Sequence, residues 1–146
     1  MEMKQILGTA LMSAMLATGA VAEGVTHKVA VHVDQNDPHV MKMALNNVEN
    51  LTKYYESQGD TALVEIVTYG PGINMLIPGN TPVKDRISVM ALEMDNITFS
   101  VCQTTLTRMS KKVGEQIVLM DEASVVPSGA VRLIELQEND YAYLRP

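Results

Sequence analysis

The sequence contains few cysteines, which form disulfide bonds, and few aromatic residues, whose rings stack. Of its 146 residues, one is cysteine (Cys102), one is phenylalanine and none is tryptophan. A single cysteine cannot form an intramolecular disulfide, so stability must come from core packing. The chain is also acidic, with a net charge of −6, and lacks the basic footprint of proteins that bind nucleic acid. The composition therefore excludes a disulfide-stapled fold and predicts no nucleic-acid partner.

Motifs that mark several common enzyme classes are missing as well. There is no Cys-x-x-Cys pair, no Gly-x-Ser-x-Gly elbow and no glycine-rich phosphate-binding motif, which disfavours thioredoxin-like and hydrolase functions. Asp34, Asp37 and His39 can meet in one loop, but no second group of ligands completes a metal coordination shell. We therefore predict neither a metal nor another cofactor.

The N-terminus has the pattern of an export signal. A short polar start, "MEMKQ", precedes the run "ILGTALMSAMLATGAVA", which ends in Ala20-Val21-Ala22, a small-x-small site for signal peptidase. We predict a signal peptide over residues 1–22, cleavage after Ala22 and a periplasmic or secreted protein. The alternative is a retained membrane anchor, although a run of about 17 residues is short for crossing a bilayer.

Residues 23–146 are sufficient for one domain with one core. They contain no second apolar run long enough to span a membrane, so we expect no membrane contact after cleavage. Exported proteins usually enter an oxidising compartment, where an exposed free thiol is oxidised. The thiol of Cys102 is therefore expected to be buried, used in chemistry, or paired between chains.

Short apolar strands alternate with amphipathic helices along this domain. Strands are predicted at 27–33, 61–69, 97–101, 123–127 and, more weakly, 141–144. Helices are predicted from Pro38 to about Gly59, from Thr81 to Asp95, over the Cys102 segment to about Lys112, and at 128–139. Residues 70–80 form a loop with one short helical turn, and 116–120 a helical turn or a strand. This order predicts an α/β fold, with three α/β/α layers around a mostly parallel sheet of about five strands.

Cys102 follows the third strand, at the sheet edge where ligands of open α/β folds gather. Ser100 and Gln103 have the spacing of a capping box, which would place Cys102 in the first helical turn, where the helix dipole favours a thiolate. The alternative is structural, because Cys102, Leu106 and Met109 also fit an apolar helical stripe. The residues alone leave both roles open.

Several stretches together resemble the DsrE/DsrF-like family, in particular its small exported members. They are "VAVHVDQND", "ALNNVENL", "IVTYGPGINML", "FSVCQTTL" and "VVPSGAVRLIELQENDYAYLRP", and the resemblance covers His27 to Pro146. It implies a three-layer fold around a parallel sheet and homo-oligomers of such subunits. It also implies a sulfur relay, in which a cysteine accepts sulfane sulfur as a persulfide and passes it to a partner. Cys102 is the candidate for that role.

The function expected from this resemblance is that of a sulfur carrier or sulfurtransferase subunit with Cys102 as persulfide acceptor. A pocket around the thiol would be lined by Asp34, His39, Gly70, Gly72, Gln103 and Thr104. Glu65 or His32 could serve as a base if the fold brings either close. Glu65 lies inside an apolar strand and is expected to face a sheet edge or a partner subunit.

A second hypothesis is a non-catalytic, oligomeric binding or scaffold module with a structural Cys102. A third is a redox sensor, in which the cysteine is reversibly oxidised. The partners expected are further copies of this chain and a sulfur donor or acceptor protein.

Overall fold

The fold is described from a computed structural model covering residues 24–146. The predicted signal peptide, residues 1–22, lies outside the described residues. None of the helices between residues 24 and 146 has the length and apolarity needed to cross a bilayer.

One parallel sheet forms the centre of the domain. Its five strands are arranged in the order β4-β3-β2-β1-β5, and every neighbouring pair is parallel. The strands are β1 (Thr26–Val33), β2 (Thr61–Thr68), β3 (Ile97–Cys102), β4 (Ala123–Val126) and β5 (Ala142–Leu144). The predicted parallel α/β/α architecture of about five strands is thus confirmed.

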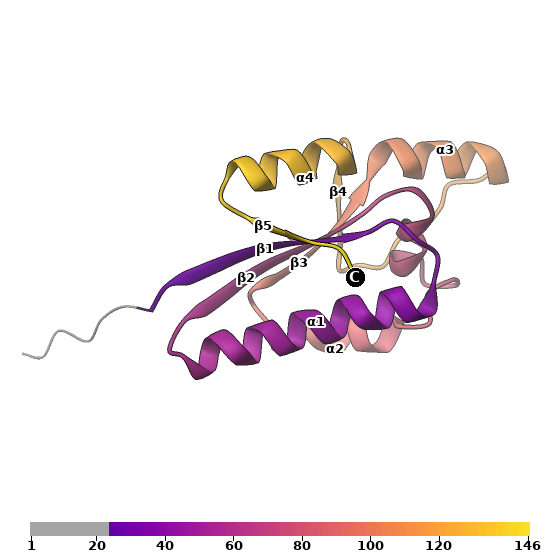
Figure 1. Ribbon diagram of the computed structural model, residues 1–146. Helices are drawn as coiled ribbons and strands as arrows, with labels where there is room; N and C mark the ends of the chain where they lie inside the picture. The colour runs from indigo at the N-terminus through magenta and orange to yellow at the C-terminus, as the bar shows by residue number, and fades with distance from the viewer. Residues whose placement is uncertain (1–23) are drawn as a thin grey trace, which may run out of the picture.

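Helices cover both faces of this sheet (Figure 1). They are α1 (Pro38–Ser57), the 3₁₀ helix η1 (Gly70–Leu76), α2 (Lys84–Glu93), α3 (Gln103–Val113) and α4 (Gly129–Glu138). In Figure 1, α1 and α2 lie together below the sheet, whereas α3 and α4 lie above it. The later residues of β1, β2 and β3 are buried on both sides because helices cover each face.

The core is divided by the sheet into two clusters of unequal size. The larger one packs α1, α2 and η1 against one face and includes Met41, Leu45 and Phe99. The smaller one lies between the sheet and α4 and consists of Ala30, Val67, Leu133 and Leu136, with two tyrosines packed against it. Most of the buried apolar side chains are therefore on the α1/α2 face, and the opposite face has room for polar groups.

Three local predictions need correction. Residues 116–120 form neither a helical turn nor a strand; this segment runs back along η1, where the N–H of Met120 donates to the carbonyl of Leu76 at 2.9 Å. Helix α2 begins at Lys84 rather than at Thr81, because the Thr81 hydroxyl accepts a hydrogen bond from the N–H of Val83 in a turn before the helix. The helical turn expected in the loop is longer, since η1 begins directly at Gly70.

Candidate functional site: the Cys102 thiol

Cys102 ends β3 and is the N-cap residue of α3. The expected capping box is therefore wrong: α3 starts at Gln103, and the hydroxyl of Ser100 donates to Glu65 instead. Cys102 is buried, with 5% exposure, but it belongs to neither hydrophobic core cluster. The thiol thus lies outside both cores, at the carboxyl edge of the sheet.

A second helix begins beside this thiol. Gly129 is the first residue of α4, with Ser128 as its cap. A Cβ atom added to Gly129 would lie 2.9 Å from the Cβ of Tyr69 and 3.2 Å from the Cβ of Cys102. Only glycine allows the N-terminus of α4 to approach the end of β3 this closely. Cys102 therefore lies between the N-terminal ends of α3 and α4, where unpaired N–H groups favour negative charge.

The hydroxyl of Thr105 connects the thiol to the glycine-rich loop. Its oxygen accepts a hydrogen bond from the N–H of Gly70 at 3.0 Å, and the Thr105 side chain also lowers the pKa of Cys102. Gly70 has a positive φ of 52°, a conformation in which glycine is favoured and which turns its N–H toward α3. The Thr105 side chain therefore links the Gly70 loop, through this hydrogen bond, to the thiol whose pKa it lowers.

These contacts decide the acidity of the thiol. Burial raises the pKa of Cys102, but hydrogen bonding to the backbone of Gly129, to the Thr105 side chain, and to the backbone of Thr105 and Thr104 lowers it. The net pKa is below the ordinary value for cysteine. The groups that lower the pKa are thus backbone amides at the starts of α3 and α4 and the Thr105 side chain, all of which stabilise the thiolate charge.

A buried ion pair fixes α4 above the sheet. Arg132 donates from Nε to one oxygen of Glu65 at 2.8 Å and from Nη2 to the other at 2.7 Å. Burial raises the pKa of Glu65, but hydrogen bonds from Arg132 and Ser100 lower it more, and the net pKa is below its ordinary value. The expectation that Glu65 faces a sheet edge or a partner subunit is therefore wrong, because β2 is the central strand and Arg132 of the same chain pairs with it.

His32 lies on the same face of the sheet as this ion pair, but its strand is separated from that of Cys102 by β2. Its Nδ1 is 2.7 Å from the hydroxyl of Tyr143, and its ring packs against Tyr69 with centroids 4.6 Å apart. Neither residue considered as a base is positioned for this role, because Glu65 is engaged by Arg132 and His32 lies on β1, with β2 between it and Cys102. A thiol with a lowered pKa does not require one.

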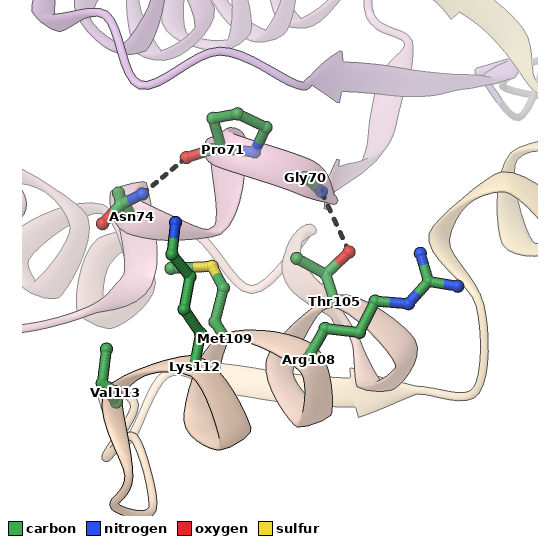
Figure 2. A pocket seen from close by; sticks show the side chains of 8 residues that line it. All are labelled: Gly70, Pro71, Asn74, Thr105, Arg108, Met109, Lys112 and Val113. Carbon is green, nitrogen blue, oxygen red and sulfur yellow. Dashed lines mark hydrogen bonds between the residues drawn. The ribbon is translucent and has the colours of Figure 1, made fainter.

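A cleft of about 510 Å³ opens between η1 and α3, next to Thr105. Figure 2 shows the side chains that line it, with the Thr105 hydroxyl directed toward the N–H of Gly70. The lining residues are Gly70, Pro71, Asn74, Thr105, Arg108, Met109, Lys112 and Val113. Cys102 does not line the cleft itself, but Thr105, which does, lowers the pKa of its thiol.

The fold brings some of the predicted pocket residues together and separates others. Thr104 contributes its backbone to the thiolate site, while its hydroxyl donates to the carbonyl of Pro127. Gly70 reaches the thiol through Thr105. Gln103 is exposed and bonds within α3. The side chain of Asp34 pairs with Arg145, and its backbone lies beside Gly70 and Gly72. Gly72 packs against the backbone of Val33, and His39 is exposed in the first turn of α1.

Sequence reasoning missed Thr105, Gly129 and Arg132. Thr105 had a detectable signal, since it lies three residues after Cys102 and side chains at this spacing near a helix start lie close together. Gly129 was visible as Ser-Gly at the start of a helix, in one of the loops that leave the carboxyl ends of strands. The partnership of Arg132 with Glu65 had no sequence signal, because 67 positions separate the two residues.

Within residues 24–146 no three His, Cys, Asp or Glu side chains are grouped so that they could hold a metal ion. The fold and site together define a parallel α/β/α protein with one acidic thiol between two helix N-termini at the carboxyl edge of its sheet.

No protein-family model matches this chain, and no curated protein matches it. Among solved structures, the chain is similar to a protein of unknown function, MTH1491 from Methanobacterium thermoautotrophicum. The two share 24% sequence identity with a TM-score of 0.66, and the match covers 82% of this chain and 99% of the other. At this identity the similarity shows the α/β fold alone.

Proposed function

We propose that this protein is a thiol-based sulfur carrier or sulfurtransferase subunit of the DsrE/DsrF-like kind, with Cys102 as the sulfur acceptor. The observation that carries the proposal is the position of the thiol. Cys102 lies between the N-termini of α3 and α4, and backbone groups of Thr104, Thr105 and Gly129 lower its pKa. A structural cysteine would not need such groups, whereas a nucleophilic one does.

The reaction requires no oxidant or reductant beyond the donor. The Cys102 thiolate attacks the outer sulfur of an organic persulfide R–S–SH, the S–S bond of the donor breaks, and the thiolate R–S⁻ leaves. Cys102 then carries the sulfane sulfur as Cys–S–SH. An acceptor thiolate removes it by the same exchange and regenerates the Cys102 thiolate. The amide groups around Cys102 favour its anionic form at the start and end of this cycle.

Several further properties belong to the same proposal. The sequence pattern supports export after cleavage at Ala22, to the periplasm or the medium. The family resemblance supports assembly into homo-oligomers and exchange of sulfur with a donor or acceptor protein. Export and assembly are tested separately from the chemistry, by the N-terminal sequence of the exported protein and by its mass in solution.

One observation favours the second hypothesis, a binding or scaffold module with a structural cysteine. Cys102 is 5% exposed, and sulfur transfer requires a reagent to reach it. The two functions therefore differ in whether the folded protein allows access to the thiol.

Alkylation of the folded protein across pH, followed by intact mass, separates them. We expect alkylation without denaturant and a midpoint below the ~8.5 of a free thiol. Treatment with polysulfide should then add the mass of one sulfur atom, and Cys102→Ser should not gain it. A thiol that reacts only after unfolding would refute the sulfur-carrier function and support the scaffold. Reactivity with oxidants but no stable sulfur addition would favour the redox sensor.

A further inference from the structure

The cleft between η1 and α3 combines positive charge with apolar walls. Arg108 and Lys112 lie one helical turn apart on α3 and both line the cleft. Within residues 24–146 neither forms an ion pair with a carboxylate, whereas Arg86, Arg132 and Arg145 each have one. The two cationic groups beside the cleft therefore remain available for an external anion.

The elements around the cleft contain no negative charge of their own. Helix α3 has the sequence QTTLTRMSKKV, with three basic residues and no acidic one, and η1, GPGINML, has no charged residue. This positive region belongs to a protein whose net charge is −6. Lysines in the last turn of a helix are also favoured by its dipole, but Arg108 lies outside that turn, so the dipole does not account for it.

The remaining walls are apolar. Pro71 comes from η1, and Met109 and Val113 come from α3. Figure 2 shows Lys112 extending from α3 toward η1 near Asn74, while Arg108 extends past Thr105. The volume of about 510 Å³ is within the range of ~300–1,000 Å³ typical of small-molecule sites. An occupant with a carbon body and an anionic end matches both the walls and the charges.

The cleft also reaches the thiol. Gly70 and Thr105 line it, and Thr105 lies on the first turn of α3, three residues after Cys102, where its side chain lowers the pKa of the thiol. A ligand anchored by its anionic end at Arg108 or Lys112, with its body along Met109, can place its other end at Thr105. The Thr105 side chain then separates that end of the ligand from the sulfur of Cys102.

From this arrangement we infer that the η1–α3 cleft is a binding site for small organic carboxylates, held at the carboxylate by Arg108 or Lys112 and along the carbon chain by Pro71, Met109 and Val113. One further step rests on the proposed function. In that step the sulfur donor is an organic persulfide that also carries a carboxylate group. The outer sulfur is then presented to Cys102, and the carboxylate thiolate is the leaving group of the exchange described above.

Titration calorimetry with 4-phenylbutyrate and its neutral isostere 4-phenylbutanamide tests the site without any sulfur chemistry. We expect the carboxylate to bind on the order of tenfold more tightly than the amide, since charge-assisted hydrogen bonds are the stronger ones. The double variant Arg108→Gln/Lys112→Gln should lose this preference. The control Lys42→Gln/Lys53→Gln removes two exposed charges from α1 and should retain it.

Equal binding of the two probes, binding of neither, or an equal loss in the control would overturn the inference. Sulfur loading separates it from the proposed function. If Cys102 takes up no sulfur but the protein still prefers the carboxylate, the carboxylate site is supported and the sulfur-carrier function is refuted. If Cys102 takes up sulfur from polysulfide but the probes bind alike, the function stands and the carboxylate site is refuted.

Discussion

Arg132 of α4 binds both oxygens of Glu65 on the central strand, at 2.8 and 2.7 Å. This pair joins α4 to the sheet three residues from Gly129, whose backbone lowers the pKa of Cys102. The ion pair therefore positions a group that acts on the thiol, although neither charged residue contributes to the pKa of Cys102 directly.

Replacing Glu65 with Gln should destabilise the fold and raise the pKa of Cys102. We expect a loss of about 2 kcal/mol in the free energy of unfolding, less than the ~3–5 kcal/mol for breaking a fully buried pair, because the Arg132 side chain is 35% exposed. Denaturant unfolding measures the first effect and alkylation against pH the second. Glu135→Gln, which removes only a 3.5 Å surface contact with Arg132, is the control. An unchanged thiol pKa in Glu65→Gln would contradict the positioning role.

The same pair predicts how stability depends on pH. The pKa of Glu65 is lowered in the folded protein, so its contribution is present above the unfolded-state value near 4.5. As the pH falls below that value, the unfolded chain binds a proton first, and the contribution is lost by the time the pH passes the folded pKa. The stability difference between the wild type and Glu65→Gln should therefore shrink in acid. A difference that is constant from pH 7 to pH 3 would be inconsistent with the ion pair.

Gly129→Ala tests the close approach of α4 to the thiol. The added methyl group would lie 2.9 Å from the Cβ of Tyr69, so α4 must shift. We expect a loss of about 1–3 kcal/mol from overpacking and a higher pKa of Cys102, measured by alkylation across pH. Gly79→Ala is the matched control, because nothing lies within 4 Å of its added Cβ. A Gly129→Ala protein with an unchanged thiol pKa would show that the α4 backbone does not act on Cys102.

Thr105→Val removes the hydroxyl between Gly70 and Cys102 while keeping the side-chain shape. Because that hydroxyl lowers the pKa of Cys102, alkylation at neutral pH should slow several-fold and its midpoint should rise. Thr105→Ser should restore much of the wild-type rate. Thr107→Val, which removes an exposed hydroxyl bonded to Gln103, should have no effect. Equal rates in Thr105→Val and the wild type would exclude a role for this hydroxyl.

His32 should remain neutral to unusually low pH. Burial lowers its pKa, the Asp34 charge raises it and the Arg145 charge lowers it, leaving a net value below the ordinary 6.5. As the pH falls below 6.5, the unfolded chain gains a proton that folded His32 resists, so stability decreases. Arg145→Gln removes a repelling cation and releases Asp34, and should raise the pKa. Imidazole NMR titration measures both proteins; a wild-type midpoint at or above 6.5 would refute the prediction.

The helices and strands were largely predictable because their apolar periodicity is local. On α1, for example, Ala44 and Val48 lie four residues apart, and both are fully buried in the structure. Predictions of the hydrogen-bond partner of a single side chain were less successful. Ser100 bonds Glu65 rather than capping α3, and the choice could not be read from spacing, since Glu65 lies 35 residues earlier.

The sequence by itself determined the alternation of strands and helices, the parallel sheet and the place of Cys102 at its carboxyl edge. These properties follow from hydrophobic period and chain connectivity. Only the tertiary structure decided what surrounds the sulfur. Gly129, Thr105 and the Glu65–Arg132 pair reach Cys102 or its neighbours through the strand order β4-β3-β2-β1-β5. That order brings distant segments together by packing, and no local pattern in the chain encodes it.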